Sequence, residues 1–184
     1  MIFPFIFLIF IYELYTKSEN PFTNIAFILL GLFYIGVPFS LVDILAFRAD
    51  DFQAKLIFGI LLLTWSNDTG AYLIGSMIGK TPLLPRISPN KTWEGSIGGL
   101  IVTLSISLLL YNFVGLIYLS NWLILALIVS VFGSFGDLIE SMLKRSLGKK
   151  DSGDLLPGHG GILDRFDAFI FLIPFAAAYL LWIR

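Results

Sequence analysis

The sequence contains no cysteine and very little charge, and each shortage excludes a class of protein. Without cysteine the chain has no disulfide framework and no thiolate metal site, so catalysis would have to use oxygen and nitrogen groups. Only 14% of the residues are charged, against about a quarter in ordinary soluble domains, and 57% are hydrophobic. Because 12 basic residues nearly balance 13 acidic ones, no overall field would attract nucleic acid. The chain is therefore predicted to be an integral membrane protein with no nucleic-acid partner.

Six apolar segments approach the length of about 20 residues that a membrane-spanning helix needs. They cover residues 1–14, 22–47, 54–79, 97–119, 122–143 and 168–183. The first is short, and it lacks the basic start and small-residue cleavage pattern of a signal peptide. Pro38 should kink or break the second. The expected fold is an all-α polytopic transmembrane helix bundle of about six membrane helices with cytoplasmic polar loops.

Lysine and arginine residues gather in two loops, at residues 80–94 and 144–165. Loops rich in these residues usually stay in the cytoplasm. Two predicted spans separate the loops, so both loops should lie on the same, cytoplasmic side of the membrane. Ser120 and Asn121 are expected to form the turn between those two spans.

Asp68 interrupts the third apolar segment near its middle. A charge inside a span is costly, so such a residue usually faces the interior of a bundle or a water-filled cavity. Gly70, Gly75 and Gly79 follow and permit close approach of another helix. The alternative is a buried aspartate satisfied by hydrogen bonds between helices.

The fifth segment ends in a polar stripe. Helical spacing places Asp137, Ser141 and Lys144 along one face, with Glu140 beside them. This stripe is either part of a functional site at the mouth of the span or a solvated helix end with an ion-pair ladder.

The next loop surrounds His159, the only histidine, with glycines that let backbone N–H groups approach an anion. Asp164 and Asp167 follow at a spacing that puts two carboxylates on one helix face, and such hard oxygen ligands suit Mg²⁺. A charged loop held to anionic lipid headgroups is the alternative.

Ser88 and Pro89 fit the N-cap and first position of a helix, whose positive end would face a phosphate. Lys91 would add a mobile positive charge there. A capped interfacial helix with Trp93 among the aromatic residues at the membrane surface is the alternative.

The run from Ser141 to Asp167 resembles the signature of phosphatidate cytidylyltransferases, also called CDP-diacylglycerol synthases. The matching positions are Ser141, Lys144, Arg145, Lys150, Asp151, Pro157, Gly158, His159, Gly160, Gly161, Asp164, Arg165 and Asp167. Further similar stretches are Asn67-Asp68-x-Gly70-Ala71-Tyr72, Ser88-Pro89-Asn90-Lys91-Thr92-x-Glu94-Gly95 and Gly136-Asp137. The resemblance therefore divides the chain into N-terminal membrane helices at 1–53, fewer than family members usually carry, and a catalytic membrane domain at 54–184.

The resemblance implies that CTP and phosphatidate are converted to CDP-diacylglycerol and pyrophosphate, with Mg²⁺ required. A lipid phosphate is already anionic, so the reaction needs neutralisation of charge more than it needs a strong base. The enzyme is expected in the inner (cytoplasmic) membrane, with the active site facing the cytoplasm. The sequence leaves open whether it forms a homodimer.

The resemblance also assigns roles to single residues. Asp137 and Asp164 are expected to be the main Mg²⁺ ligands, with Asp167 and Asp68 completing the site and a second cation left open. The remaining expected catalytic residues are Lys144, Arg145, Lys150, Asp151, His159 and Arg165, of which the basic ones hold phosphates. The expected substrate-binding residues are Asp68, Ser88, Asn90, Lys91, Thr92, Gly160 and Gly161.

Two other functions stay open at this point. One is a related enzyme that activates another lipid phosphate. The other is an ion-coupled transporter, because Asp68 in a glycine-interrupted helix resembles the midplane sites of such carriers.

Overall fold

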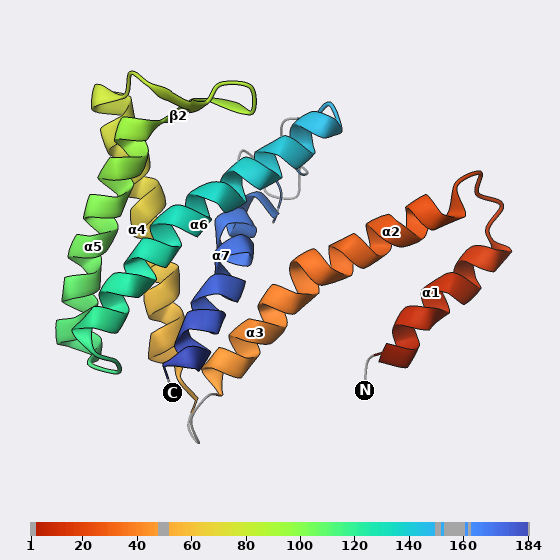
Figure 1. Cartoon of the computed structure of the whole chain (residues 1–184), viewed down its shortest axis with the longest axis horizontal. Helices are drawn as coiled ribbons and strands as arrows, with labels where there is room; N and C mark the ends of the chain where they lie inside the picture. The colour runs from red at the N-terminus through yellow and green to blue at the C-terminus, as the bar shows by residue number, and fades with distance from the viewer. Residues whose placement is uncertain (1–2, 48–51, 150–151, 153–160, 162, 184) are drawn as a thin grey trace.

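The computed structural model describes residues 3–47, 52–149, 152, 161 and 163–183. These residues form a bundle of helices with one small hairpin at its end (Figure 1). The elements are α1 (Phe3–Tyr15), α2 (Pro21–Gly31), the π-helical turn η1 (Leu32–Gly36), α3 (Val37–Ala46), α4 (Ala54–Ile78), β1 (Pro82–Leu84), β2 (Ser88–Thr92), α5 (Trp93–Val114), α6 (Leu119–Ser146) and α7 (Leu163–Trp182). The prediction of a helical bundle is confirmed, apart from the hairpin.

Four helical segments in the described part of the chain are long and apolar enough to cross a membrane: Pro21–Ala46, Trp93–Val114, Leu119–Ser146 and Leu163–Trp182. α1 is apolar but only 13 residues long. α4 has 25 residues, but Asn67 and Asp68 lower its hydropathy and it is not one of the four. Four of the six predicted spans are thus supported by length and composition.

Pro38 does not break the second predicted span, because α2, η1 and α3 continue as one helix (Figure 1). Proline cannot donate a hydrogen bond to the carbonyl one turn earlier, and its ring crowds that turn. The preceding residues, Leu32–Gly36, form a π-helical turn. Such a turn is a common irregularity in an otherwise regular helix, and here it accommodates the proline.

The turn between the fourth and fifth spans was predicted at the wrong place. Ser120 and Asn121 lie in the first turn of α6, and residues 115–118 form the connection. Gly115 ends α5 with a φ of 60°, a left-handed conformation that glycine adopts without steric cost.

The predicted helix start at Ser88 is also wrong, because Ser88–Thr92 is strand β2, which pairs antiparallel with β1. Pro89 is tolerated in this two-stranded hairpin, where an edge position needs no N–H donor. The helix starts instead at Trp93. Thr92 is its N-cap, and the Thr92 hydroxyl accepts a hydrogen bond from Gly95 N at 3.1 Å.

Glycines bring α4 and α5 into close contact. A Cβ atom on Gly70 would lie 2.8 Å from Val102 Cβ, and one on Gly99 would lie 2.8 Å from the carbonyl oxygen of Asn67. Gly75 lies against Gly95 in the same interface. Membrane helices associate through such close packing because lipid supplies little hydrophobic driving force.

Gly136 has the same effect where α6 meets α7. A Cβ atom there would lie 2.7 Å from Phe171 Cβ and 2.8 Å from the carbonyl oxygen of Asp167. The start of α7 is therefore fixed beside the second half of α6. Further along, the two helices share an apolar core with α3 and α4, which includes Leu45, Ile60, Leu63, Leu125, Val129, Leu172, Ile173 and Leu180.

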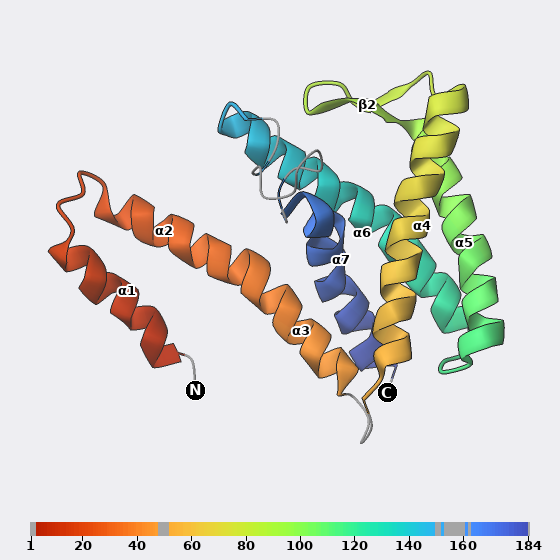
Figure 2. The same cartoon turned by 180° about the vertical axis from the view of Figure 1, so that it is seen from behind.

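The β1–β2 hairpin and the last turns of α6 lie at the same end of the bundle, and both chain termini lie at the other end (Figures 1 and 2). The described parts of the two basic loops therefore share one side, as predicted. This end of the bundle carries the polar residues of the candidate site.

Candidate active site

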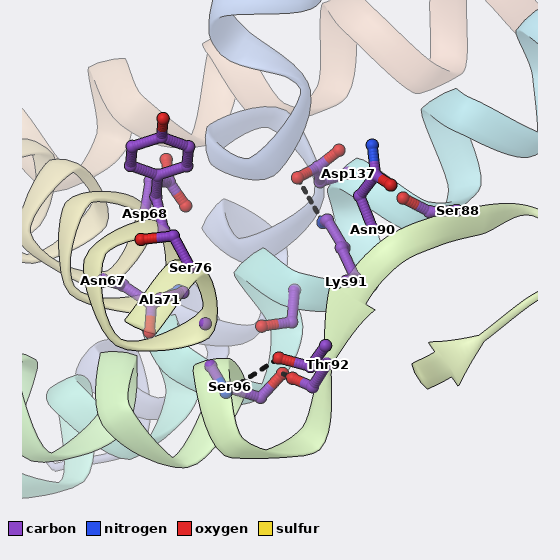
Figure 3. A pocket seen from close by; sticks show the side chains of 14 residues that line it. Asn67, Asp68, Ala71, Ser76, Ser88, Asn90, Lys91, Thr92, Ser96 and Asp137 are labelled. Carbon is purple, nitrogen blue, oxygen red and sulfur yellow. Dashed lines mark hydrogen bonds and ion pairs between the residues drawn. The ribbon is translucent and has the colours of Figure 1, made fainter. Parts of the chain in front are cut away.

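A cavity of about 550 Å³ lies among α4, β2, α5 and α6 (Figure 3). Its lining is mostly polar or small: Asn67, Asp68, Ala71, Tyr72, Gly75, Ser76, Ser88, Asn90, Lys91, Thr92, Gly95, Ser96, Ser134 and Asp137. Five of the predicted substrate-binding residues line this cavity, together with Asp137. The structure thus brings together three stretches that are far apart in the sequence.

Lys91 and Asp137 form an ion pair across this cavity (Figure 3). The lysine extends from β2 and the aspartate from α6. Their side chains are 27% and 36% exposed, so the pair remains open to solvent and to ligands. Asp68 lies on α4, on another wall of the cavity, and interacts electrostatically with both residues.

Glu94 fixes the base of the hairpin that carries Lys91. Its carboxylate accepts hydrogen bonds from Lys80 N at 3.1 Å, Thr81 N at 3.1 Å and Thr81 Oγ1 at 2.8 Å. The backbone N–H of Trp93 also donates to the Thr81 carbonyl at 3.0 Å. These bonds tie the start of the loop to the first turn of α5, which places Lys91 over the cavity.

A second polar cluster lies further along α6, where α7 begins. Lys144 Nζ lies 2.5 Å from Glu140 Oε2 and 2.7 Å from Asp164 Oδ1. The other oxygen of Asp164 accepts from Ser152 N at 3.0 Å, Ser152 Oγ at 2.8 Å and Gly161 N at 2.7 Å. Asp164 therefore joins α6, α7 and two points of the intervening loop.

Asp167 interacts electrostatically with residues of both the cavity and the second polar cluster. Its Oδ1 accepts a hydrogen bond from Ala168 N at 2.7 Å. Its charge also interacts with those of Asp137, Glu140 and Asp68. Acidic side chains from α4, α6 and α7 thus share one region, which favours the arrival of a cation.

The remaining predicted residues fall into two groups. Arg145 and Arg165 are exposed, at the end of α6 and the start of α7, where a phosphate could reach them. Four others lie outside the described residues: Lys150, Asp151, His159 and Gly160. Their roles stay predictions. Gly161 was predicted to bind substrate. In this structure its backbone N–H donates a hydrogen bond to the Asp164 carboxylate, which is part of the protein.

Asp137 lines the cavity, whereas Asp164 pairs with Lys144 in the second cluster, and their shared role as metal ligands stays a prediction. Among the described residues, no group of three or more histidine or acidic side chains is arranged to hold a metal ion. Asp164 already binds Lys144 and the loop. Asp68 and Asp137 do line one cavity. Since Mg²⁺ is usually held by one or two carboxylates together with water and substrate phosphates, this pair has suitable chemistry.

Several residues of this region had no role that the sequence pattern predicts. Glu140 could have been paired with Lys144, because they stand four residues apart on one helix. Asn67 and Ser134 line the cavity, and Ser152 binds Asp164. The sequence pattern did not mark Ser134 or Ser152, and it marked Asn67 only as part of a stretch that resembles the family, because each contact depends on how the helices and the loop pack.

The sequence pattern that defines the cytidylyltransferase family matches residues 1–183. The chain belongs to this family. Phosphatidate cytidylyltransferases from Staphylococcus haemolyticus, Staphylococcus aureus and Staphylococcus epidermidis are 45%, 44% and 41% identical to it over 170 residues. Each alignment covers 91% of this chain and 64% of the relative, so the chain spans a little under two thirds of the relatives' length.

Family membership confirms the resemblance drawn from the motifs. It also weighs against an ion-coupled transporter, because the match covers nearly the whole chain, including the helix that carries Asp68. The cavity lined by Asp68, Lys91 and Asp137 is thus the candidate active site of a member of a nucleotidyltransferase family.

Proposed function

We propose that this chain transfers a cytidylyl group from CTP to phosphatidate, which yields CDP-diacylglycerol and pyrophosphate and supplies phospholipid biosynthesis. A phosphate oxygen of the lipid attacks the α-phosphorus of CTP. The bond from that phosphorus to the oxygen bridging to the β-phosphate breaks, and pyrophosphate leaves with the bonding electrons. The attacking oxygen is already anionic, so no side chain has to remove a proton. The barrier lies in repulsion between the two substrates and in the charge of the leaving group.

The observation that carries the proposal is the meeting of Lys91 and Asp137 at one cavity. The lysine would bind a phosphate, and the carboxylate would bind the metal. Lys91 would move from Asp137 to the phosphates of CTP. The Ser88 hydroxyl and the Asn90 amide line the same wall and offer further hydrogen-bond donors.

Lys144 lies seven residues after Asp137 on α6, which corresponds to about 10 Å along the helix axis. We propose that Lys144 binds substrate phosphates at this end of the site, together with Arg145, Arg165 and Lys150. The lipid would enter sideways, with its acyl chains still in the bilayer and only its phosphate among these groups.

Mg²⁺ is part of this proposal, with Asp68 and Asp137 as its holders and Asp167 nearby. When bound, the ion would neutralise charge on the phosphates and on the departing pyrophosphate. Asp164 keeps Lys144 and the loop in place in the state described above, and its predicted contact with the metal stays a prediction. Whether a second cation is needed, and whether two copies assemble, stay predictions as well.

The placement in the membrane is also proposed. α4 packs against α5 and α6, and its 25 residues measure about 37 Å, which is enough to cross a bilayer of about 30 Å. With α1, which at 13 residues is short for a span, it would bring the number of membrane helices to the six predicted. The basic end of the bundle would face the cytoplasm, which holds CTP, and the membrane would be the inner (cytoplasmic) one. Residues 54–184 would then form the catalytic domain and residues 1–53 the N-terminal membrane helices.

The function is tested with the purified chain in lipid nanodiscs that contain phosphatidate. Radiolabelled CTP and Mg²⁺ are added, and label in the organic phase and released pyrophosphate are measured. We expect equal amounts of both products from the wild type. Asp137→Asn should lower the rate by about a hundredfold or more, as does the loss of other groups that stabilise charge in the transition state.

Asp43→Asn is the matched control, because Asp43 is an exposed aspartate of α3 that does not line the cavity. It should keep the wild-type rate. Replacing phosphatidate by a polyprenyl phosphate tests the related enzyme with another lipid substrate. Label transfer to polyprenyl phosphate alone, or full turnover by Asp137→Asn, would contradict the proposal.

A further inference from the structure

Glu140 is a fully buried acidic residue on a membrane helix, with only 1% of its surface exposed. An ionised carboxylate is costly to remove from water and persists only where a cation and hydrogen bonds accompany it. Lys144 supplies the cation from one helical turn further along α6, with 2.5 Å between Nζ and Oε2. Since this interior position would be stable with an apolar side chain, the carboxylate calls for an explanation beyond packing.

The Lys144 ammonium is held from two sides. It also lies 2.7 Å from Asp164 Oδ1 on α7, and the Glu140 and Asp164 carboxylates lie next to each other. One positive charge between two negative ones leaves a negative excess. The lysine side chain, 18% exposed, is therefore drawn back into this position and away from solvent.

This arrangement still leaves Lys144 able to bind a ligand. An ammonium group has three N–H donors, and the two carboxylates take two of them. A lysine side chain loses much rotamer entropy when it is fixed. Here that loss occurs on folding, so a phosphate that meets the third donor finds it already oriented.

We propose that Glu140 is a positioning residue, which acts through Lys144 by holding it against Asp164 with one donor left for a substrate phosphate. The proposal rests on the proposed cytidylyl transfer for the identity of that phosphate. It goes beyond it in assigning a task to a residue that touches no substrate. Asp164 alone could not do this task, because it also binds Ser152 and Gly161 and would leave the lysine anchored from one side.

The first test measures the position of Lys144 directly and needs no turnover. The full chain in nanodiscs is treated briefly with an amine-acetylating reagent, and the labelling rate of Lys144 is read by peptide mass spectrometry. Glu140→Gln should raise that rate several-fold, because the ammonium is then held on one side only. Lys91, measured in the same digest, should keep its rate and serves as the internal reference.

Glu13→Gln is the matched control. Glu13 is also a buried glutamate, 5% exposed, but it lies on α1 and accepts a hydrogen bond from Asn24 at 2.8 Å, outside the Lys144 cluster. It should leave the labelling of Lys144 unchanged. If Glu140→Gln labels Lys144 at the same rate as the wild type and the control, the proposal is wrong.

The second test is a double-mutant cycle on the rate of CTP incorporation. Glu140→Gln alone should lower kcat by roughly tenfold to a hundredfold, as expected for a displaced catalytic group, and Glu140→Asp should restore part of it. Because Glu140 acts through Lys144, the double variant with Lys144→Met should be no slower than Lys144→Met alone. The double variant also removes the buried Glu140 charge that Lys144→Met alone would leave without its cation, so it should fold at least as well as Lys144→Met. Additive losses would overturn the proposal.

The two tests also separate the proposal from the proposed function. If the wild-type chain incorporates no label into lipid, the function fails, and the acetylation rates still decide whether Glu140 positions Lys144. If the wild type is active and Lys144 labelling does not respond to Glu140→Gln, the function stands and the positioning role fails.

Discussion

Replacing Lys91 should change the affinities for metal and nucleotide in opposite directions. In the structure Lys91 is the counter-ion of Asp137, so a metal ion that binds Asp137 must displace it or meet its repulsion. Lys91→Met removes both obstacles and should tighten binding of a divalent ion in the absence of nucleotide. The same change removes a cation from the wall that is proposed to receive CTP, and so should weaken nucleotide binding.

The size of the first effect follows from the exposure of the pair. Two unit charges about 4 Å apart attract by about 1 kcal/mol in water and about 4 kcal/mol near a protein surface. Because the two side chains are 27% and 36% exposed, we expect a net value at the low end, about 1 kcal/mol. That corresponds to about fivefold in metal affinity. The loss of a hydrogen bond from a charged donor should weaken CTP binding by about tenfold or more.

Mn²⁺ serves as the probe for the metal, because free Mn²⁺ can be counted by electron paramagnetic resonance. CTP binding is measured separately by equilibrium dialysis with labelled nucleotide. Lys80→Met is the control, since Lys80 is an exposed lysine of the same loop that does not line the cavity. Mn²⁺ affinity that is unchanged or lower in Lys91→Met, with Lys80→Met like the wild type, would refute the role of Lys91 as a counter-ion.

Two further predictions concern the parts that place the site. Gly136→Ala should lower the melting temperature and the rate of CTP incorporation, because the new Cβ would meet Phe171 Cβ at 2.7 Å and force α7 away from α6. Gly133→Ala is the control, since the nearest contact of its new Cβ is 3.7 Å, and it should leave the melting temperature and the rate near those of the wild type. Glu94→Gln should raise the KM for CTP several-fold with little change in melting temperature, because it loosens the hairpin that presents Lys91. An unchanged KM in steady-state kinetics would show that the hairpin keeps its position without Glu94.

The helices that long apolar runs predicted are present in the structure. Runs such as 22–47 and 168–183 specify helices because a chain in lipid must satisfy its backbone hydrogen bonds internally. The boundaries were less predictable. Ser88 and Pro89 fit a helix start locally, but pairing of Thr92 with Pro82, ten residues earlier, makes this stretch a strand. Pairing between strands is not visible in the local pattern on which the prediction relied.

The residue types of the site could be predicted, but most of their partners could not. Asp68 and Asp137 were found because charges are rare within apolar segments. That Lys91 meets Asp137 depends on how α4, α5 and α6 pack and on the hairpin that Glu94 holds. Likewise, Asp164 was expected to share a metal with Asp137, and its actual contacts with Lys144 and the loop follow from the approach of α7 at Gly136.

The two lysines explain how so acidic a site can exist beside a lipid bilayer. Lys91 pairs with Asp137, and Lys144 pairs with Glu140 and Asp164, so each lysine offsets carboxylates that would otherwise stay uncompensated near the membrane. Both lysines are also the proposed partners of the substrate phosphates. Binding of a metal with nucleotide would therefore exchange the Lys91–Asp137 ion pair for two others, because the metal would take over Asp137 while Lys91 would pass to a phosphate. Lys144 would meet a phosphate with its third donor while Glu140 and Asp164 still hold it. Such an exchange conserves the balance of charge, and it predicts that metal and CTP bind more tightly together than either does alone.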